Sequence, residues 1–139
     1  MSSIVVFVVI IAVILGVAIT MIMYLTHGRD GLLDKQKYQR DWLKIENSLD
    51  SSNLNSYRLA ILDADSLLDR ALKEIGIDGA NMGDRLKHAD AKFANINQVW
   101  MAHKLRNHLA HNADAKVNII VLRRAVAIFK KSLKELGAI

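Results

Sequence analysis

Residues 54–75 read LNSYRLAILDADSLLDRALKEI, and the spacing of hydrophobic residues in this stretch predicts an amphipathic helix. At 3.6 residues per turn, the apolar side chains fall within about half of the circumference, and Asp, Arg, Ser and Lys occupy the rest. The apolar set is Leu54, Tyr57, Ala60, Ile61, Ala64, Leu67, Leu68, Ala71, Leu72 and Ile75. Asn53 is a suitable N-cap and Gly76 a suitable stop, so one long helix with one buried face is expected.

Further helices are expected after this stretch, over residues 82–89, 95–111 and 117–136, with a break and a cap at 112–114. The buried stripe of the last helix is expected to be Val121, Leu122, Ala125, Ile128, Phe129, Leu133 and Leu136, ending at Gly137. No segment alternates at period two over a strand's length. Residues 53–139 are therefore predicted to form an all-α antiparallel helical bundle.

Upstream, residues 4–25 read IVVFVVIIAVILGVAITMIMYL, a 22-residue apolar run long enough to span the roughly 30 Å hydrocarbon core of a membrane. We expect residues 1–26 to be a retained transmembrane anchor that contacts the lipid bilayer through residues 4–25. A cleaved signal peptide would have a basic start and a shorter apolar core, whereas MSS carries no side-chain charge.

Basic residues follow the apolar run, and no Lys or Arg precedes it. The residues concerned are His27, Arg29, Lys35, Lys37 and Arg40. The positive-inside rule then predicts a single-pass protein of the inner membrane, with its N-terminus outside and the rest in the cytoplasm. Residues 27–52 carry Tyr38, Trp42, Ile45 and Leu49 on one helical face and are expected to form a juxtamembrane helical stalk.

The composition narrows the possible chemistry. The 139 residues include no Cys and no Pro and carry a formal net charge of +5. A disulfide scaffold and a thiolate metal site are thereby excluded. His108 and His111 stand three residues apart without a carboxylate at ligand spacing, so neither a metal site nor any other cofactor is expected. Asp63, Asp65 and Asp69 lie on the polar side of residues 54–75 and are expected to be surface charges.

One arginine falls where a hydrophobic residue is expected. On the helix over 95–111, Arg106 shares the sector of Val99, Ala102 and Leu109. An unpaired buried guanidinium is costly, so Arg106 must meet a carboxylate, helix-end carbonyls, or a cleft that water and a polyanion can enter. Beside it, a polar stripe is formed by His103, Asn107 and His111, each four residues from the last.

The stretch Arg106-Asn107-His108-Leu109-Ala110-His111 resembles the R-x4-6-H motif of HEPN domains, with a polar residue after the arginine. The resemblance implies a small helical bundle that forms a homodimer and, in many members, a metal-independent endoribonuclease. It implies that His111 is the acid/base, that Arg106 stabilises the phosphorane charge and that Asn107 orients one of them. His103 and His108, on the same helix, are expected to be supporting residues. A toxin-like member of the family would carry a Tyr where this chain has Ala113.

A non-catalytic interpretation stays open beside this one. In it, Arg106 binds helix-end carbonyls, His111 caps the helix, and the bundle is a membrane-tethered module that binds a protein partner or RNA. In an ideal helix, Arg106 and His111 point about 140° apart, so their convergence requires a helix end near Ala110 or a second subunit. Catalysis requires that solvent can reach Arg106, whereas the alternative requires that its own chain satisfies the guanidinium.

The helix over 117–136 carries a row of basic residues opposite its apolar stripe. The row consists of Arg123, Arg124, Lys130, Lys131 and Lys134. Such a row is most often a solvated face. Its functional alternatives are contact with an RNA backbone or with the anionic inner leaflet of the membrane.

Overall fold

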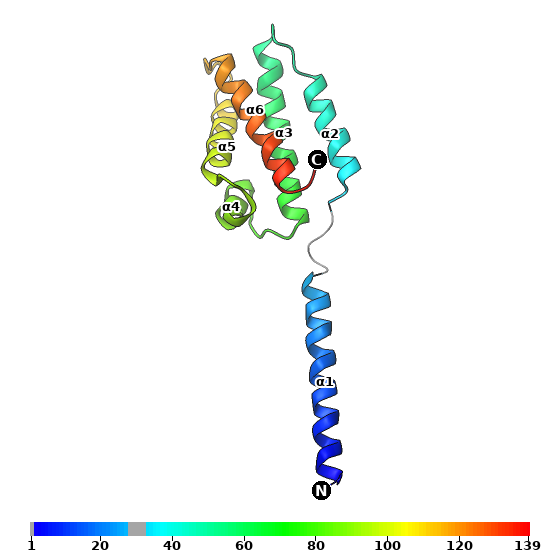
Figure 1. Cartoon of the computed structure of the whole chain (residues 1–139). Helices are drawn as coiled ribbons and strands as arrows, with labels where there is room; N and C mark the ends of the chain where they lie inside the picture. The colour runs from blue at the N-terminus through cyan, green and yellow to red at the C-terminus, as the bar shows by residue number, and fades with distance from the viewer. Residues whose placement is uncertain (1, 28–32) are drawn as a thin grey trace. The chain divides into compact units, whose positions relative to one another are not determined.

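The structure, a computed structural model, describes residues 2–27 and 33–139 and is all-helical over those residues. The chain divides into two compact units, residues 1–31 and residues 32–139. Seven helical segments are assigned in the described residues (Figure 1). They are α1 (Ser2–His27), α2 (Lys35–Asn47), α3 (Leu54–Glu74), α4 (Met82–His88), the short 3-10 turn η1 (Asp90–Lys92), α5 (Ile96–His111) and α6 (Ile119–Glu135).

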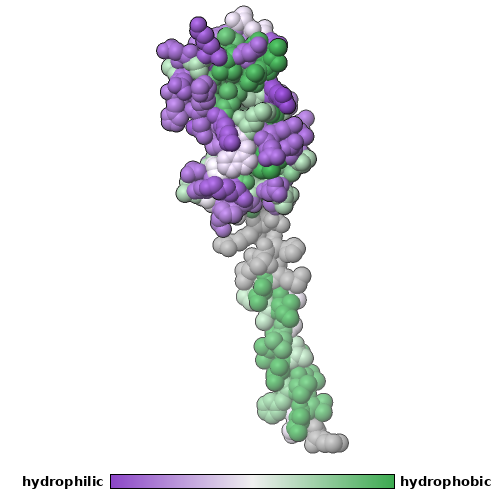
Figure 2. Space-filling view, turned by 90° about the vertical axis from the view of Figure 1, so that its left-hand side faces the viewer, coloured by the Kyte–Doolittle hydropathy of each residue, from purple (hydrophilic) through white to green (hydrophobic). Residues whose placement is uncertain are grey.

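Helix α1 is the predicted apolar helix. Its stretch Ser3–Ile22 has a mean hydropathy of 3.3 and is long and apolar enough to cross a membrane. The large hydrophobic side chains between Ile4 and Ile22 are 48–70% exposed, so no protein surface covers them. A helix that is apolar on every side and uncovered by protein is typical of a membrane span. In Figure 2, this helix is hydrophobic along its length.

The second unit is a bundle in which α3 is the central helix. Helix α3 packs against α2, α4, α5 and α6, and α6 also packs against α5 (Figure 1). The core is made of fully buried side chains from several helices, among them Ile61, Leu68, Leu72, Leu122, Phe129 and Leu133. The predicted buried face of residues 54–75 is thereby confirmed, since its members from Tyr57 to Leu72 are buried.

The helix ends follow the local sequence. Asparagine side chains cap four helices by accepting a backbone N–H: Asn53, Asn81, Asn95 and Asn118 begin α3, α4, α5 and α6. Gly76 and Gly137 adopt positive φ angles of 84° and 71°, which a glycine tolerates best. At both, two backbone hydrogen bonds close the helix, for instance from Ile77 N to Leu72 O at 2.9 Å. The predicted stops at both glycines are confirmed.

Three expectations about the bundle differ from the structure. Helix α2 is not a separate stalk, because Tyr38, Trp42 and Ile45 are buried in the unit that contains α3. Its apolar face needs a partner, and the side of α3 next to it supplies one. Helix α6 begins at Ile119 after Asn118, not at Val117, and the break at residues 112–114 does not cap it.

Val121 and Leu54 were expected to be buried, but they are 47% and 49% exposed. Both lie in the first turn of their helices, where fewer neighbouring helices cover the surface. Figure 2 shows hydrophobic side chains on the surface at the end of the bundle where α6 begins. The helical period assigns these residues to the correct side of each helix, but it does not say how far the neighbouring helices extend.

Candidate functional site

Helix α5 carries the predicted motif, and its packing decides where each polar side chain lies. Val99, Ala102 and Leu109 are buried. This packing turns His103 toward α3, where it is only 8% exposed. The Arg106 side chain lies at the margin of the same face and is 31% exposed.

Four side chains form a closed polar ring, made of Asp65, His103, Asn107 and Arg106. Asp65 Oδ1 lies 2.8 Å from His103 Nδ1, and His103 Nε2 lies 3.2 Å from Asn107 Nδ2. Arg106 donates from a terminal guanidinium nitrogen to Asn107 Oδ1 at 3.1 Å. The ring closes through an ion pair of 3.4 Å between Arg106 Nε and Asp65 Oδ2. Both oxygens of Asp65 therefore face α5.

The expectation that Asp65 is a surface charge is wrong. Asp65 is 3% exposed, and its carboxylate is matched by the His103 hydrogen bond and the Arg106 guanidinium. A carboxylate is found at such a depth when it is paired and hydrogen-bonded. The sequence held a signal for it, because Asp65 follows Ile61 by four residues and precedes Leu68 by three. That spacing places it within the buried stripe.

The polar ring borders a solvent-open hollow of about 550 Å³. Its walls come from α3, from the start of α4 and from α5; Asp65, His103, Arg106 and Asn107 all line it. Gly83 stands opposite His103, and a Cβ built there would lie 3.7 Å from His103 Nε2. Because residue 83 has no side chain, the hollow reaches the Nε2 edge of the imidazole.

A second acidic and basic pair lies beside the ring. Asp69 lines the hollow, and its Oδ1 lies 3.4 Å from a terminal guanidinium nitrogen of Arg85 on α4. Arg85 is 7% exposed, so α4 brings a buried positive charge toward the two carboxylates of α3. The charges of Asp65 and Asp69 are thus balanced by Arg106 and Arg85, and the surroundings of the hollow are close to neutral.

The other predicted catalytic residue, His111, does not line the hollow. His111 and His108 are exposed in the last turn of α5, where His108 Nδ1 lies 3.3 Å from Asn112 Nδ2. Since α5 continues to His111, no helix end at Ala110 turns His111 toward Arg106. Within one chain, the structure brings Arg106 and Asn107 together with His103, and leaves His111 about 140° away around the helix.

The contacts that the non-catalytic interpretation predicted belong to other residues. Arg58 of α3, and not Arg106, binds carbonyls after the end of α5; it donates to Asn112 O, Ala113 O and Ala115 O at 2.7–2.8 Å. Asn112, and not His111, is the C-cap of α5. The guanidinium of Arg106 is nevertheless engaged by its own chain, through the ion pair with Asp65 and one hydrogen bond to Asn107, although its buried Nε makes no hydrogen bond.

Most of the predicted basic row on α6 is engaged by neighbouring side chains. Lys130 pairs with Glu46 of α2 and holds the pKa of that carboxyl below its usual value through their hydrogen bond. Lys131 lies 3.7 Å from Glu135 of its own helix, and the Arg123 guanidinium lies over the Tyr57 ring at 5.7 Å from its centroid.

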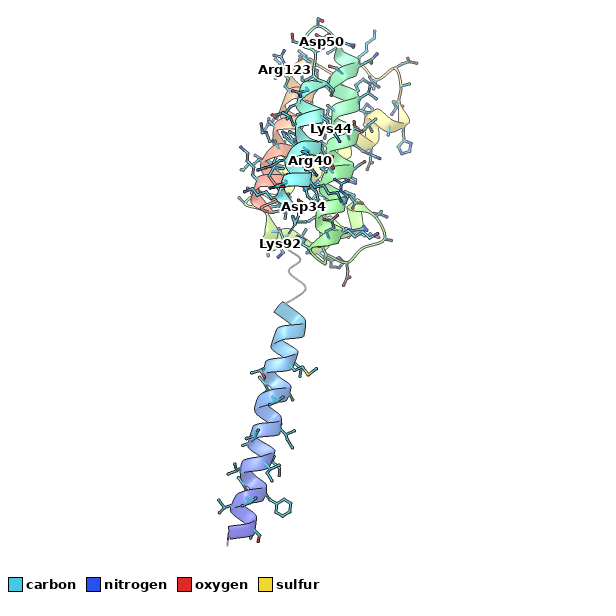
Figure 3. All side chains as sticks on the ribbon, turned by 90° about the vertical axis from the view of Figure 1, so that its right-hand side faces the viewer. Asp34, Arg40, Lys44, Asp50, Lys92 and Arg123 are labelled. Atoms are coloured by element: carbon cyan, nitrogen blue, oxygen red, sulfur yellow. The ribbon has the colours of Figure 1, made fainter. Side chains whose placement is uncertain are left out.

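Basic side chains also lie elsewhere on the bundle. In Figure 3, Arg40 and Lys44 lie along α2, Lys92 lies toward one end of the bundle and Arg123 toward the other. The structure therefore describes basic side chains distributed over several faces, which is the pattern of a solvated surface.

Comparisons with models of known protein families, with curated proteins and with solved structures find no match to this chain. Among the described residues, no group of three or more His, Asp or Glu side chains is placed to hold a metal ion.

Proposed function

We propose that the chain is a single-pass protein of the inner membrane, with the bundle in the cytoplasm. The proposal is supported by α1, whose apolar side chains are uncovered, and by the basic residues Lys35, Lys37 and Arg40 after it. Arg29, which contributes to the same argument, lies outside the described residues.

We further propose that the bundle is HEPN-like and cleaves RNA without a metal ion. One observation carries this proposal: Arg106 and Asn107 of the motif line a solvent-open hollow, next to an imidazole that a buried carboxylate orients. A guanidinium can bind two phosphate oxygens, and Arg106 keeps 31% of its side chain exposed for this purpose. An imidazole is suited to proton transfer near neutral pH, and the motif gives that role to His111.

The site of this proposed enzyme is composite. His111 points away from the hollow of its own chain, so in a homodimer it would serve the hollow of the second copy. There its imidazole would take the proton of the ribose 2′-hydroxyl, whose oxygen attacks the adjacent phosphorus. The bond from phosphorus to the 5′-oxygen would break, and the leaving 5′-oxygen would receive the proton that His111 had taken, giving a 2′,3′-cyclic phosphate end. Arg106 would stabilise the phosphorane charge, and Asn107 would hold the Arg106 guanidinium in place.

A second function has its own supporting observation. Arg106 is paired with Asp65 and hydrogen-bonded to Asn107, so the fold alone accounts for its presence. In this case the bundle is a membrane-tethered interaction module that binds RNA or a protein partner, and the polar ring only joins α3 to α5.

The test is cleavage of a mixed RNA substrate in EDTA by the full chain in detergent micelles. His111→Ala is the informative variant, because His111 is exposed and its loss should leave the fold intact. His108→Ala is the matched control, since His108 is also exposed on the last turn of α5. The oligomeric state and the melting temperature are measured for each protein.

We expect the wild type and His108→Ala to produce 2′,3′-cyclic phosphate ends, and His111→Ala to lose at least about 100-fold in rate, as for removal of a general acid/base. Absence of cleavage by a folded dimer would reject the enzyme and leave the interaction module. Equal loss in both histidine variants would assign the effect to the helix end and not to the motif.

A further inference from the structure

The polar ring permits only one arrangement of its hydrogen atoms. Arg106 can only donate, so the atom of Asn107 that it meets at 3.1 Å is the amide oxygen. The amide NH₂ of Asn107 then faces His103 Nε2 at 3.2 Å, and Nε2 must accept. The imidazole proton is therefore on Nδ1, which donates to Asp65 Oδ1 at 2.8 Å. Each polar contact fixes the next.

A second proton on His103 is incompatible with this arrangement. An Nε2–H would point at the NH₂ of Asn107, so two donors would face each other. Rotating the Asn107 amide by 180° would turn its oxygen toward His103, but its NH₂ would then face the guanidinium of Arg106. Either geometry removes one hydrogen bond of the ring, and Asn107 cannot serve both neighbours.

The charged groups around His103 come from three helices. Helix α3 supplies Asp65 in direct contact and Asp69 across the hollow. Helix α5 supplies Arg106, and α4 supplies Arg85, which is paired with Asp69. Trp100 of α5 adds an uncharged contact, because its ring meets the imidazole edge to face with the ring centroids 6.0 Å apart.

We propose that neutral His103, held by Asp65, is the positioning residue that fixes Asn107 and Arg106 at the hollow, and that its protonation releases them. In this view, acidification does not remove a catalytic group. It frees the Arg106 guanidinium from Asn107 and changes where that guanidinium lies. The link to RNA cleavage rests on the proposed function, but the hydrogen-bond arrangement itself does not.

The experiment is nitrogen-15 NMR of the histidine rings in the full chain in detergent micelles, from pH 8 to pH 5. In the wild type at pH 8, we expect the His103 proton on Nδ1, and an Arg106 Nε–H signal that shifts as His103 becomes protonated. His108 and His111 are internal references in the same spectra. Either of two results would overturn the proposal: a His103 proton on Nε2 at pH 8, or an Arg106 Nε–H signal that does not shift as His103 becomes protonated.

Asn107→Asp supplies the decisive variant. A carboxylate at 107 accepts from both neighbours, so it suits a protonated His103 while still accepting from Arg106. We expect His103 to stay doubly protonated to a pH about one unit or more above that in the wild type. Asn112→Asp is the matched control, because it places a carboxylate beside His108 and should move only that ring. If His103 becomes doubly protonated at the same pH in Asn107→Asp as in the wild type, the proposal is contradicted.

These readouts separate the two proposals. If the NMR result holds and RNA is not cleaved, His103 positions a ring that belongs to an interaction module. If RNA is cleaved through His111 but Asn107→Asp leaves the His103 titration unchanged, the enzyme stands and the role of His103 is rejected. If both hold, cleavage by the wild type should fall over the pH range in which His103 becomes protonated.

Discussion

The buried polar side chains of this bundle differ in whether they have a hydrogen-bond partner. Asp65 and His103 satisfy each other, but the hydroxyl of Tyr38 and Nε1 of Trp42 are buried without a hydrogen-bond partner among the described residues. A buried polar atom without a partner costs about 1–3 kcal/mol. Both lie on the buried face of α2, whose Asp41 and Glu46 accept hydrogen bonds from Arg70 of α3 and Lys130 of α6.

Tyr38→Phe tests this cost. Burial raises the pKa of Tyr38 from 10.0 to about 12, against the opposing effect of the Arg70 guanidinium. The folded chain thus keeps the phenolic proton where the unfolded chain has lost it. The stability this contributes is complete below pH 10 and lost as the pH rises through about 12, a change of about 2–3 kcal/mol.

We expect Tyr38→Phe to be at least as stable as the wild type at pH 7, within about 1 kcal/mol, because no hydrogen bond is lost. We also expect it to lose less stability between pH 10 and pH 12. Denaturant unfolding at several pH values measures both. Tyr57→Phe is the control for loss of a phenol. A neutral-pH loss of more than about 2 kcal/mol in Tyr38→Phe would show that the hydroxyl has a partner.

At the scale of elements, the connection between α5 and α6 is held by one side chain of α3. Arg58 donates to three backbone carbonyls at residues 112–115, a stretch that lies outside the helices. Hydrogen bonds from a charged donor contribute about 1.5–3 kcal/mol when they are well formed. The orientation of α6 after the α5 end therefore depends on a residue about fifty-five positions earlier in the chain.

Arg58→Ala should release this connection. We expect a loss of about 1–2 kcal/mol in the free energy of unfolding, since the three carbonyls can partly return to water. Hydrogen exchange followed by mass spectrometry should speed up over residues 112–118 more than in α3. Arg124→Ala, which removes an exposed arginine of α6, should change neither quantity. Uniform acceleration across the bundle would mean that Arg58 supports the whole core.

At the scale of the whole molecule, the chain combines a helix that is long and apolar enough to cross a membrane with a bundle that has its own core. The two compact units have separate sets of contacts, and the bundle buries apolar side chains from all five of its α-helices.

The proposed orientation can be tested directly because the chain contains no cysteine. Ser3→Cys and Ser51→Cys each introduce one exposed thiol, at the start of α1 and in the turn before α3. In intact cells, we expect a membrane-impermeant maleimide to label Cys at position 3 and to label position 51 only after permeabilisation. The reverse pattern would invert the topology, and release of the bundle into the medium would indicate a cleaved signal sequence.

The features of this protein that depend on residues close together in the sequence could be predicted from the sequence alone. The apolar length of α1, the asparagine caps and the stops at Gly76 and Gly137 each depend on residues within a few positions of one another. For the same reason, the sequence placed Arg106 in an apolar sector, where it required a carboxylate, helix-end carbonyls or a cleft open to water and a polyanion.

Only the tertiary structure decided which groups meet. It paired Arg106 with Asp65, forty-one positions away, placed α2 inside the bundle and left His111 outside the hollow. The period of a helix defines its faces, but the partner of each face depends on how separate helices pack. The polar ring depends on contacts between residues far apart in the sequence. Its hydrogen bond between His103 and Asp65 forms because α5 packs against α3.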